Sequence, residues 1–471
     1  MFGSTLRRPV RSALRLSLSA ALAVGLALTV VAAWQPSRPD RDTTAAGALG
    51  LAAYKNRATP GSFTGYAFDQ CNAPSQSAMD TWLNYSPYFG IGIYISGRNR
   101  ACSAQPNLTA RWVHSQLSKG WKLLPLTVGP QASCNAHFPA SGRINANPQG
   151  TYGRARNQGR AEAASALAAA RRLGIPAGST LFYDLEGFDA GNSGCRLSSL
   201  WFLNGWTTIL HDHGYLSGVY SSASSGIKAL DDFRVSGPRI YKKPDELWVA
   251  DWDGKADSSS THLRADGWLN ERIKQYAGGH HATYGTVTIN IDSDFVDVRH
   301  GSYAPLPYHH CGNVDVTFDH YYPVKPPTRS AKPNPAVVKA LSCLLKERGG
   351  YTGRVTGTYT TALRGAINAW QRSHHMPVNP IFGRRNWMAL LATNSHPTLK
   401  YGAAGERVRD LQRTLDAVDV RLRLPVTGIY DARTKAAVET YQATLGGSRS
   451  GITQPWTWKA LASGRYARPL T

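Results

Sequence analysis

The sequence predicts an α/β protein, a (β/α)8 TIM-type barrel followed by two small three-helix modules. Between residues 61 and 310, eight short apolar runs alternate with helical stretches, which matches the size and rhythm of such a barrel. After residue 335 the sequence repeats with a period of 70–71 residues, which indicates two copies of one small unit. An open doubly wound sheet is the alternative for the first part, but no G-x-G-x-x-G sequence follows the first strand.

Residues 1–34 have the pattern of an export signal. Four arginines precede an uncharged apolar run of 19 residues from Leu16 to Trp34, and a basic region before an apolar one is typical of such signals. The run is also long enough to span a bilayer if it is not cleaved. We therefore expect an extracellular or cell-wall protein, with residues 1–34 as signal peptide or membrane anchor and residues 35–60 as a tether.

The barrel is expected over residues 61–322, with strands where short apolar runs are bounded by turn residues. The helix at Asn157–Leu173 is rich in strong helix formers and ends at Gly174. The other clear helices are expected at Ser75–Asn84, Leu108–Ser118 and Ser198–His213. The eight strands are expected at Thr64–Phe68, Gly90–Ile95, Lys122–Val128, Thr180–Leu185, Leu216–Tyr220, Glu246–Ala250, Arg272–Tyr276 and Val287–Ile291.

A proline-rich segment, residues 323–334, reads as a stiff linker between the barrel and the repeats. Each repeat has the pattern helix, turn with Thr-Gly, helix, loop and short helix. The copies are expected at residues 335–393 and 397–463, where Val338–Leu341 matches Val408–Leu411 and Trp387–Leu390 matches Trp458–Leu461.

Six cysteines fit an oxidising compartment and a disulfide-bonded protein. No C-x-x-C pair is present, so a zinc cage is not expected. Fifteen pairings can be drawn, and the simplest joins sequence neighbours: Cys71 with Cys102, Cys134 with Cys195, and Cys311 with Cys343.

Acidic residues follow four of the expected strands, at the rim where barrel active sites lie. Residues i and i+2 of a strand point to the same face, so each D-x-[DE] pair can aim two carboxyl groups the same way. Asp253 precedes a glycine and is the member most typical of a turn. The acids are Asp69, Asp184 and Glu186, Asp251 and Asp253, and Asp292 and Asp294.

Clustered carboxyl groups raise one another's pKa, so one can stay protonated while another is ionised. Cleavage of a glycosidic bond needs this combination of a proton donor and a carboxylate. A metal site would be another use, but no calcium-loop or H-E-x-x-H pattern accompanies the acids, and we expect no metal or cofactor. Gln275, Tyr276 and Trp252 are candidate sugar-binding residues, although core packing is an equal alternative for each.

These motifs resemble the glycoside-hydrolase-like domain of secreted actinobacterial proteins known as domain of unknown function 1906, which is similar to the family 25 lysozymes. The resemblance implies that Glu186 is the proton donor, with Asp184 beside it, and that Asp69 and Asp292 or Asp294 line the same cleft. We expect substrate-binding roles for Asp251, Trp252, Gln275, Tyr276 and Asp294, which lie in the motifs that carry this resemblance. The motifs are Gly65–Asp69, Tyr183–Gly187, Leu247–Trp252, Lys274–Tyr276 and Ile291–Phe295.

The C-terminal repeats resemble three-helix peptidoglycan-binding modules through their V-x-x-L, V-T-G-x-Y, [WY]-Q and W-x-A-L elements. In the second copy Asp431 follows the turn, as that family has it. The resemblance implies that the modules bind cell-wall peptidoglycan; a helical spacer is the alternative.

The net charge of +23 divides unevenly along the chain. Residues 61–322 carry only +1, whereas residues 323–471 carry +16, so the excess marks the repeats rather than a nucleic-acid-binding core. We therefore expect a monomeric cell-wall glycoside hydrolase whose partner is peptidoglycan or another wall glycan. The alternative is a non-catalytic scaffold that holds the same glycans.

Overall fold

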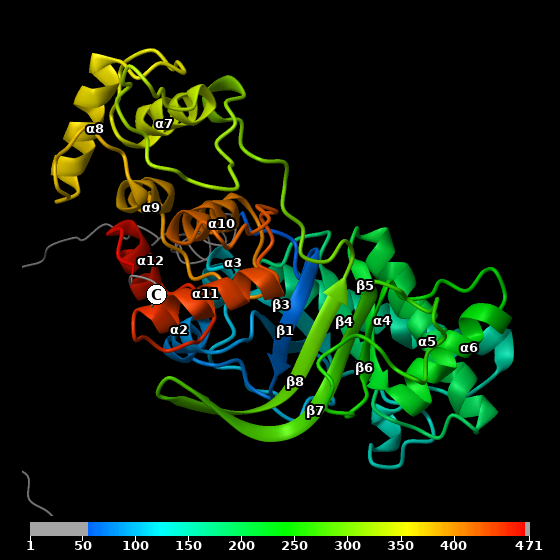
Figure 1. The fold of residues 1–471 in the computed structure, drawn as a ribbon. Helices are drawn as coiled ribbons and strands as arrows, with labels where there is room; N and C mark the ends of the chain where they lie inside the picture. Colours follow the sequence, from blue (N-terminus) through cyan, green and yellow to red (C-terminus); the bar gives the residue numbers. More distant parts are fainter. Residues whose placement is uncertain (1–54, 467–471) are drawn as a thin grey trace, which may run out of the picture. The chain divides into compact units, whose positions relative to one another are not determined.

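The computed structural model describes residues 55–466, and its first part is a closed barrel of eight strands in the order β1 to β8 (Figure 1). Each expected strand is present and begins within a few residues of its predicted first residue. The predicted fold class is confirmed. The strands are β1 Phe63–Asp69, β2 Gly90–Ser96, β3 Lys122–Thr127, β4 Thr180–Asp184, β5 Leu216–Ser222, β6 Glu246–Ala250, β7 Glu271–Tyr284 and β8 Val287–Val298.

The barrel is not wholly parallel, and in this respect the expected (β/α)8 pattern is wrong. Strands β1 to β7 pair in parallel, but β8 runs antiparallel to both β7 and β1. Only two residues lie between Tyr284 and Val287, enough for a hairpin turn and too few for the crossover that a parallel strand requires. Figure 1 shows the long curved hairpin that β7 and β8 form.

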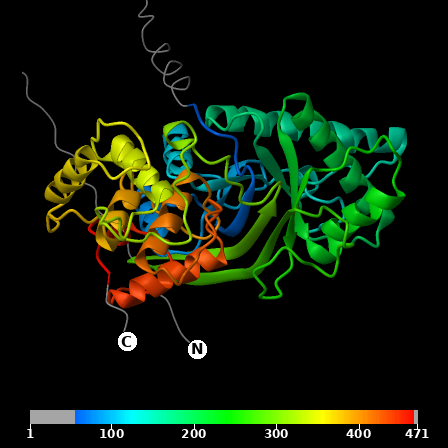
Figure 2. The same cartoon turned by 45° about the horizontal axis from the view of Figure 1, so that its top comes forward.

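The helices expected between the first five strands are confirmed and lie outside the strands (Figure 2). Side-chain oxygens cap several of their N-termini: Ser75 accepts from Ala78 N, and Thr109 accepts from Trp112 N. The β6–β7 connection, residues 251–270, contains no helix. The helices are α2 Gln76–Tyr85, α3 Ala110–Ser118, α4 Gln149–Arg172, α5 Ser193–Asp212 and α6 Lys228–Ser236.

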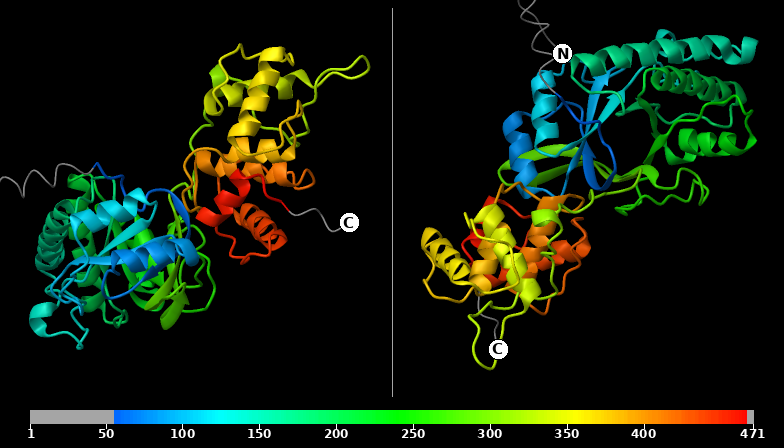
Figure 3. Two further views of the ribbon diagram at one scale, coloured as in Figure 1. Left: turned by 90° about the vertical axis from the view of Figure 1, so that its left-hand side faces the viewer. Right: turned by 90° about the horizontal axis from the view of Figure 1, so that it is seen from above.

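The sequence repeat appears as two sets of three helices (Figure 3). Equivalent side chains make equivalent bonds: Trp387 Nε1 donates to Tyr322 O at 3.1 Å, and Trp458 Nε1 donates to Pro397 O at 2.8 Å. Val324 exchanges backbone hydrogen bonds with Phe382, so the start of the proline-rich segment belongs structurally with the first module. The helices are α7 Pro335–Arg348, α8 Thr361–Ser373, α9 Arg384–Ala392, α10 Glu406–Val418, α11 Ala432–Thr444 and α12 Pro455–Ala462.

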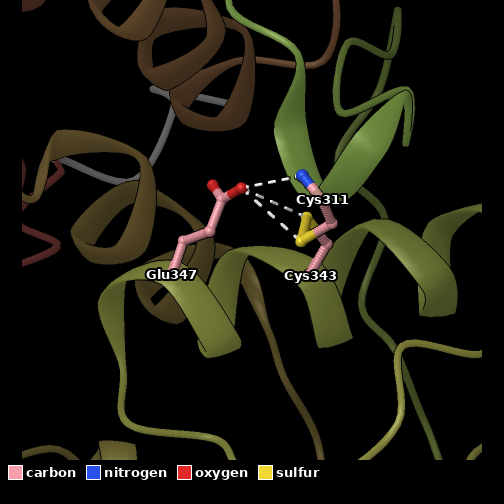
Figure 4. Close-up of side chains that lie close together, drawn as sticks. All are labelled: Cys311, Cys343 and Glu347. Atoms are coloured by element: carbon pink, nitrogen blue, oxygen red, sulfur yellow. Dashed lines mark hydrogen bonds between the residues drawn. A yellow bond between two sulfur atoms is a disulfide. The ribbon is translucent and has the colours of Figure 1, made fainter.

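All three disulfides join sequence neighbours, as in the simplest of the fifteen pairings. The Cys311–Cys343 disulfide lies beside Glu347, whose Oε1 accepts from Cys311 N at 2.9 Å (Figure 4). Cysteine and glutamate are metal-ligand types, but both sulfurs are bonded to each other and offer no thiolate. This cluster therefore ties the segment after the barrel to α7.

The predicted export segment, residues 1–34, and most of the tether lie outside the described residues. Within residues 55–466 no helix is both long enough and apolar enough to cross a membrane.

Candidate active site

The predicted acidic residues meet at the rim formed by the C-terminal ends of the parallel strands. Asp69 ends β1 and lies directly opposite Asp292 of the antiparallel strand β8. Asp184 ends β4, and Glu186 follows it in the β4–α5 connection. Two hollows, of about 390 and 410 Å³, open here, and Glu186 lines both. The site is therefore a cleft with Glu186 between its two halves.

The carboxyl group of Asp69 is buried against the barrel lumen. Tyr94 OH donates to its Oδ1 at 3.3 Å, and Gln275 Nε2 donates to its Oδ2 at 2.8 Å. Burial, followed by the nearby charge of Asp292, raises the pKa of Asp69 from 3.8 to about 7, although both hydrogen bonds oppose this. Asp69 therefore changes charge near neutral pH.

Asp69 also explains why a glycine occupies position 92 on the neighbouring strand. A Cβ at Gly92 would lie 2.5 Å from Asp69 Cβ and 3.0 Å from the ring of Trp248. The lumen is thus filled up to the level of the carboxyl group.

Asp184 and Glu186 have different environments although they are two residues apart. Asp184 is buried, its Oδ1 has no hydrogen-bond partner, and burial, Glu186 and Asp69 raise its pKa well above the ordinary value. Glu186 is exposed to the cleft, and the partial enclosure of its carboxyl group raises its pKa. Gln131 fixes this turn by accepting from Glu186 N at 2.8 Å and donating to Asp184 O at 2.7 Å.

Gln275 of β7 joins the acidic side of the cleft to its aromatic side. Its Nε2 donates to Asp69 and, at 3.3 Å, to Asp292 Oδ2. Its Oε1 accepts from Tyr220 OH at 3.0 Å and from Trp252 Nε1 at 2.9 Å. The amide is therefore fully used and held in one orientation.

Trp252 forms an exposed aromatic surface beside the second hollow. Its side chain is 66% exposed, yet its Nε1 is bound to Gln275, and its ring lies against Gly278, where a Cβ would approach to 2.5 Å. Neighbouring Asp251 lines the same hollow and accepts from Ser260 Oγ at 2.7 Å. A ring that is anchored and still exposed can stack on a sugar face.

Two candidate substrate-binding residues do not reach the cleft. Asp294 lies deeper in the barrel, fully buried, and accepts from Trp248 Nε1 at 2.8 Å. Tyr276 points to the opposite face of β7 from Gln275, where it interacts with Ser293. Asp253, the expected turn residue, pairs with the buried Lys274 at 3.1 Å.

Sequence reasoning did not find Gln131, Tyr94, Tyr220 and Arg100, all of which contact or line this cleft. Tyr94 and Tyr220 carried a signal, because each lies near the end of a predicted strand. Gln131 and Arg100 lie in connections, where strand periodicity gives no direction to a side chain.

The fold and the cleft define a glycoside hydrolase-like barrel with helical modules. Residues 80–296 match the model of the Rv2525c-like, glycoside hydrolase-like domain, and residues 404–461 match that of a putative peptidoglycan binding domain. The chain thus contains a domain of each kind, and this combination indicates a cell-wall-associated protein.

No curated protein matches the chain. Among solved structures, an uncharacterized protein of B. stearothermophilus shares 18% identity at a TM-score of 0.33, over 50% of this chain and 97% of the other. The Mycobacterium tuberculosis Tat-secreted protein Rv2525c, in complex with L-tartrate, shares 12% identity at a TM-score of 0.33, over 49% of this chain and 95% of the other. The modular autolysin LytC of Streptococcus pneumoniae shares 11% identity at a TM-score of 0.31, over 49% of this chain and 46% of the other.

Proposed function

We propose that the barrel hydrolyses glycosidic bonds of peptidoglycan or a related wall glycan. The observation that carries this proposal is Glu186, an exposed carboxyl group with a raised pKa at the junction of two hollows. A polymer lying across both hollows would place one of its linkages at Glu186. The acidic cluster of Asp69, Asp184 and Asp292 then lies on the side where a sugar carbon would develop positive charge.

In this mechanism Glu186, whose pKa is raised by the partial enclosure of its carboxyl group, donates a proton to the leaving oxygen. The Asp69–Asp292 pair supplies negative charge as nucleophile, base or electrostatic stabiliser, and the ionised fraction of Asp69 grows as the pH rises through about 7. Asp184 lies buried beside Glu186, and burial, followed by the nearby charges of Glu186 and Asp69, raises the pKa of its carboxyl group well above the ordinary value. Trp252 and Asp251, which line the second hollow, orient the sugar, and Gln275 holds the Trp252 ring in place.

Replacing Glu186 by glutamine tests the proposal, because the amide keeps the shape and cannot donate the proton. We expect the variant to fold and to lose release of reducing sugar from purified peptidoglycan by at least roughly 100-fold. Asp189→Asn is the matched control: it lies in the same connection, exposed, and lines neither hollow. Turnover by Glu186→Gln equal to that of the control would refute the assignment.

The second candidate is a non-catalytic scaffold, favoured by the peptidoglycan-binding match at residues 404–461. It predicts that the exported, monomeric protein sediments with sacculi but produces no muropeptides that mass spectrometry can detect. In both cases the charge of +16 on residues 323–471 supports retention on an anionic envelope, and retention should weaken with salt.

A further inference from the structure

Within the part of the chain that the structure describes, Arg100 is the one cationic residue that lines the first hollow, to which four acidic residues also contribute. It lies in the β2–α3 connection, is half-buried, and lines the first hollow together with Asp69, Glu186 and Asp292. Backbone carbonyls hold the guanidinium: Nε donates to Gly97 O at 3.0 Å, and Nη1 donates to Tyr94 O at 3.1 Å. These two bonds leave other N–H groups of the five-donor fork without a hydrogen-bond partner among residues 55–466.

The cleft acids do not neutralise this cation. Among the residues that the structure describes, none forms an ion pair with Arg100 within 4.0 Å. The pKa values of Asp69 and Glu186 are raised by burial, and Arg100 does not lower either of them. Its electrostatic partner is Glu162, a buried carboxyl on α4 whose own pKa is raised by burial. Arg100 is therefore not needed to set the charge of the acidic cluster.

The backbone that carries Arg100 is fixed. The Cys71–Cys102 disulfide joins the β1–α2 connection to this segment, and both cysteines line the same hollow. Gln105 Nε2 adds bonds to Cys71 O at 2.7 Å and Cys102 O at 3.2 Å. A guanidinium on a cross-linked loop loses little freedom when it binds a ligand, and its planar fork matches a carboxylate.

We propose that Arg100 is a specificity-determining residue that binds a carboxylate carried by the glycan in the first hollow. The cleft would then select acidic glycans over neutral ones of the same length. This inference rests on the proposed function, since it assumes that the cleft holds a glycan.

The test measures binding by calorimetry to the full chain carrying Glu186→Gln, so that turnover does not interfere. The ligands are peptide-free glycan strands with free lactyl carboxylates and the same strands after chemical reduction of those carboxylates to alcohols. We expect the acidic strands to bind roughly 10- to 100-fold more tightly than the reduced ones. Adding Arg100→Gln should remove the part of this preference that the cleft contributes, leaving the salt-sensitive attraction of residues 323–471, and Arg100→Lys should restore part of it.

Arg98→Gln is the matched control, because Arg98 is exposed on the same connection and is bound to Ser141 O rather than lining the hollow. If Arg100 has a purely structural role, Arg100→Gln should lower the thermal unfolding temperature and weaken the binding of both ligands equally. That result would overturn the proposal. Glycan strands that still carry stem peptides identify the source of the carboxylate. If they bind more tightly than the peptide-free strands, and Arg100→Gln removes this gain, the carboxylate belongs to the peptide. If no glycan binds at all, the proposed function fails together with this inference.

Discussion

Replacing Asp69 by asparagine should stabilise the protein above pH 7 while abolishing hydrolysis. Burial raises the pKa of the Asp69 carboxyl from 3.8 to about 7. In the unfolded chain the group titrates near its ordinary value, so between these two pH values the folded protein holds a proton that the unfolded chain has released. The stability that this proton contributes is fully present below pH 4 and is lost as the pH rises through 7.

The magnitude follows from the same two values. The two pKa values differ by about 3 units, and each unit corresponds to about 1.36 kcal/mol. Through this group the wild-type protein therefore loses about 4 kcal/mol of folding stability between pH 4 and pH 8. This figure is an upper bound, because relaxation of the structure around an ionised Asp69 reduces the loss. Asparagine does not ionise and avoids this loss. Its Oδ1 can accept from Gln275, and its amide can donate to Tyr94, whose hydroxyl can rotate and accept.

Urea unfolding of both proteins at pH 4.5 and pH 8.5 provides the measurement. The stability of Asp69→Asn relative to wild type should rise with pH and reach a gain of roughly 2–4 kcal/mol at pH 8.5. Asp419→Asn is the control, because a hydrogen bond from Arg421 lowers the pKa of Asp419 below its ordinary value. The stability that this ionised group contributes is lost only below about pH 4, so the stability of Asp419→Asn relative to wild type should be the same at pH 4.5 and pH 8.5. An Asp69→Asn difference that does not depend on pH would show that burial does not shift this carboxyl.

Three further perturbations follow from the cleft. Gln275→Met removes a hydrogen bond that lowers the pKa of Asp69, so the acidic limb of kcat/KM against pH should move to higher pH. Trp252→Ala should change the free energy of unfolding by about 0.5 kcal/mol or less and weaken glycan binding measured by calorimetry roughly three- to tenfold. Replacing Cys71 and Cys102 by serine opens a cross-link between residues 31 apart and should destabilise the protein by about 3–4 kcal/mol in urea unfolding.

The direction of β8 could have been predicted from chain length. The expected strands Arg272–Tyr276 and Val287–Ile291 leave ten residues between them, fewer than the dozen or more that a parallel crossover requires. The apolar runs gave the position of each strand correctly because burial on the barrel depends on local pattern. Strand direction depends instead on the length of the connection between two runs, which the runs themselves do not reveal.

The faces of the site residues follow from the sequence, but their depths do not. Period-two alternation correctly places Gln275 on the cleft side of β7, and the same rule places its neighbour Tyr276 on the other side. It cannot tell that Asp184 is buried while Glu186 is exposed, because that depends on the turn held by Gln131 from a distant connection. Arg100 is equally invisible to periodicity, since two backbone carbonyls rather than a strand aim it.

The reversed strand decides which aspartate of the Asp292-Ser293-Asp294 motif can meet substrate. In a parallel strand the later residue lies nearer the C-terminal rim, so Asp294 would be the accessible one. Because β8 descends from the rim, Asp292 lies opposite Asp69 at the cleft, whereas Asp294 pairs with Ala67 one step deeper. There Trp248 bonds Asp294 and closes it off from solvent. One motif therefore supplies a carboxyl group to the cleft and another to the core beneath it, and the choice between them is made by the two-residue hairpin turn.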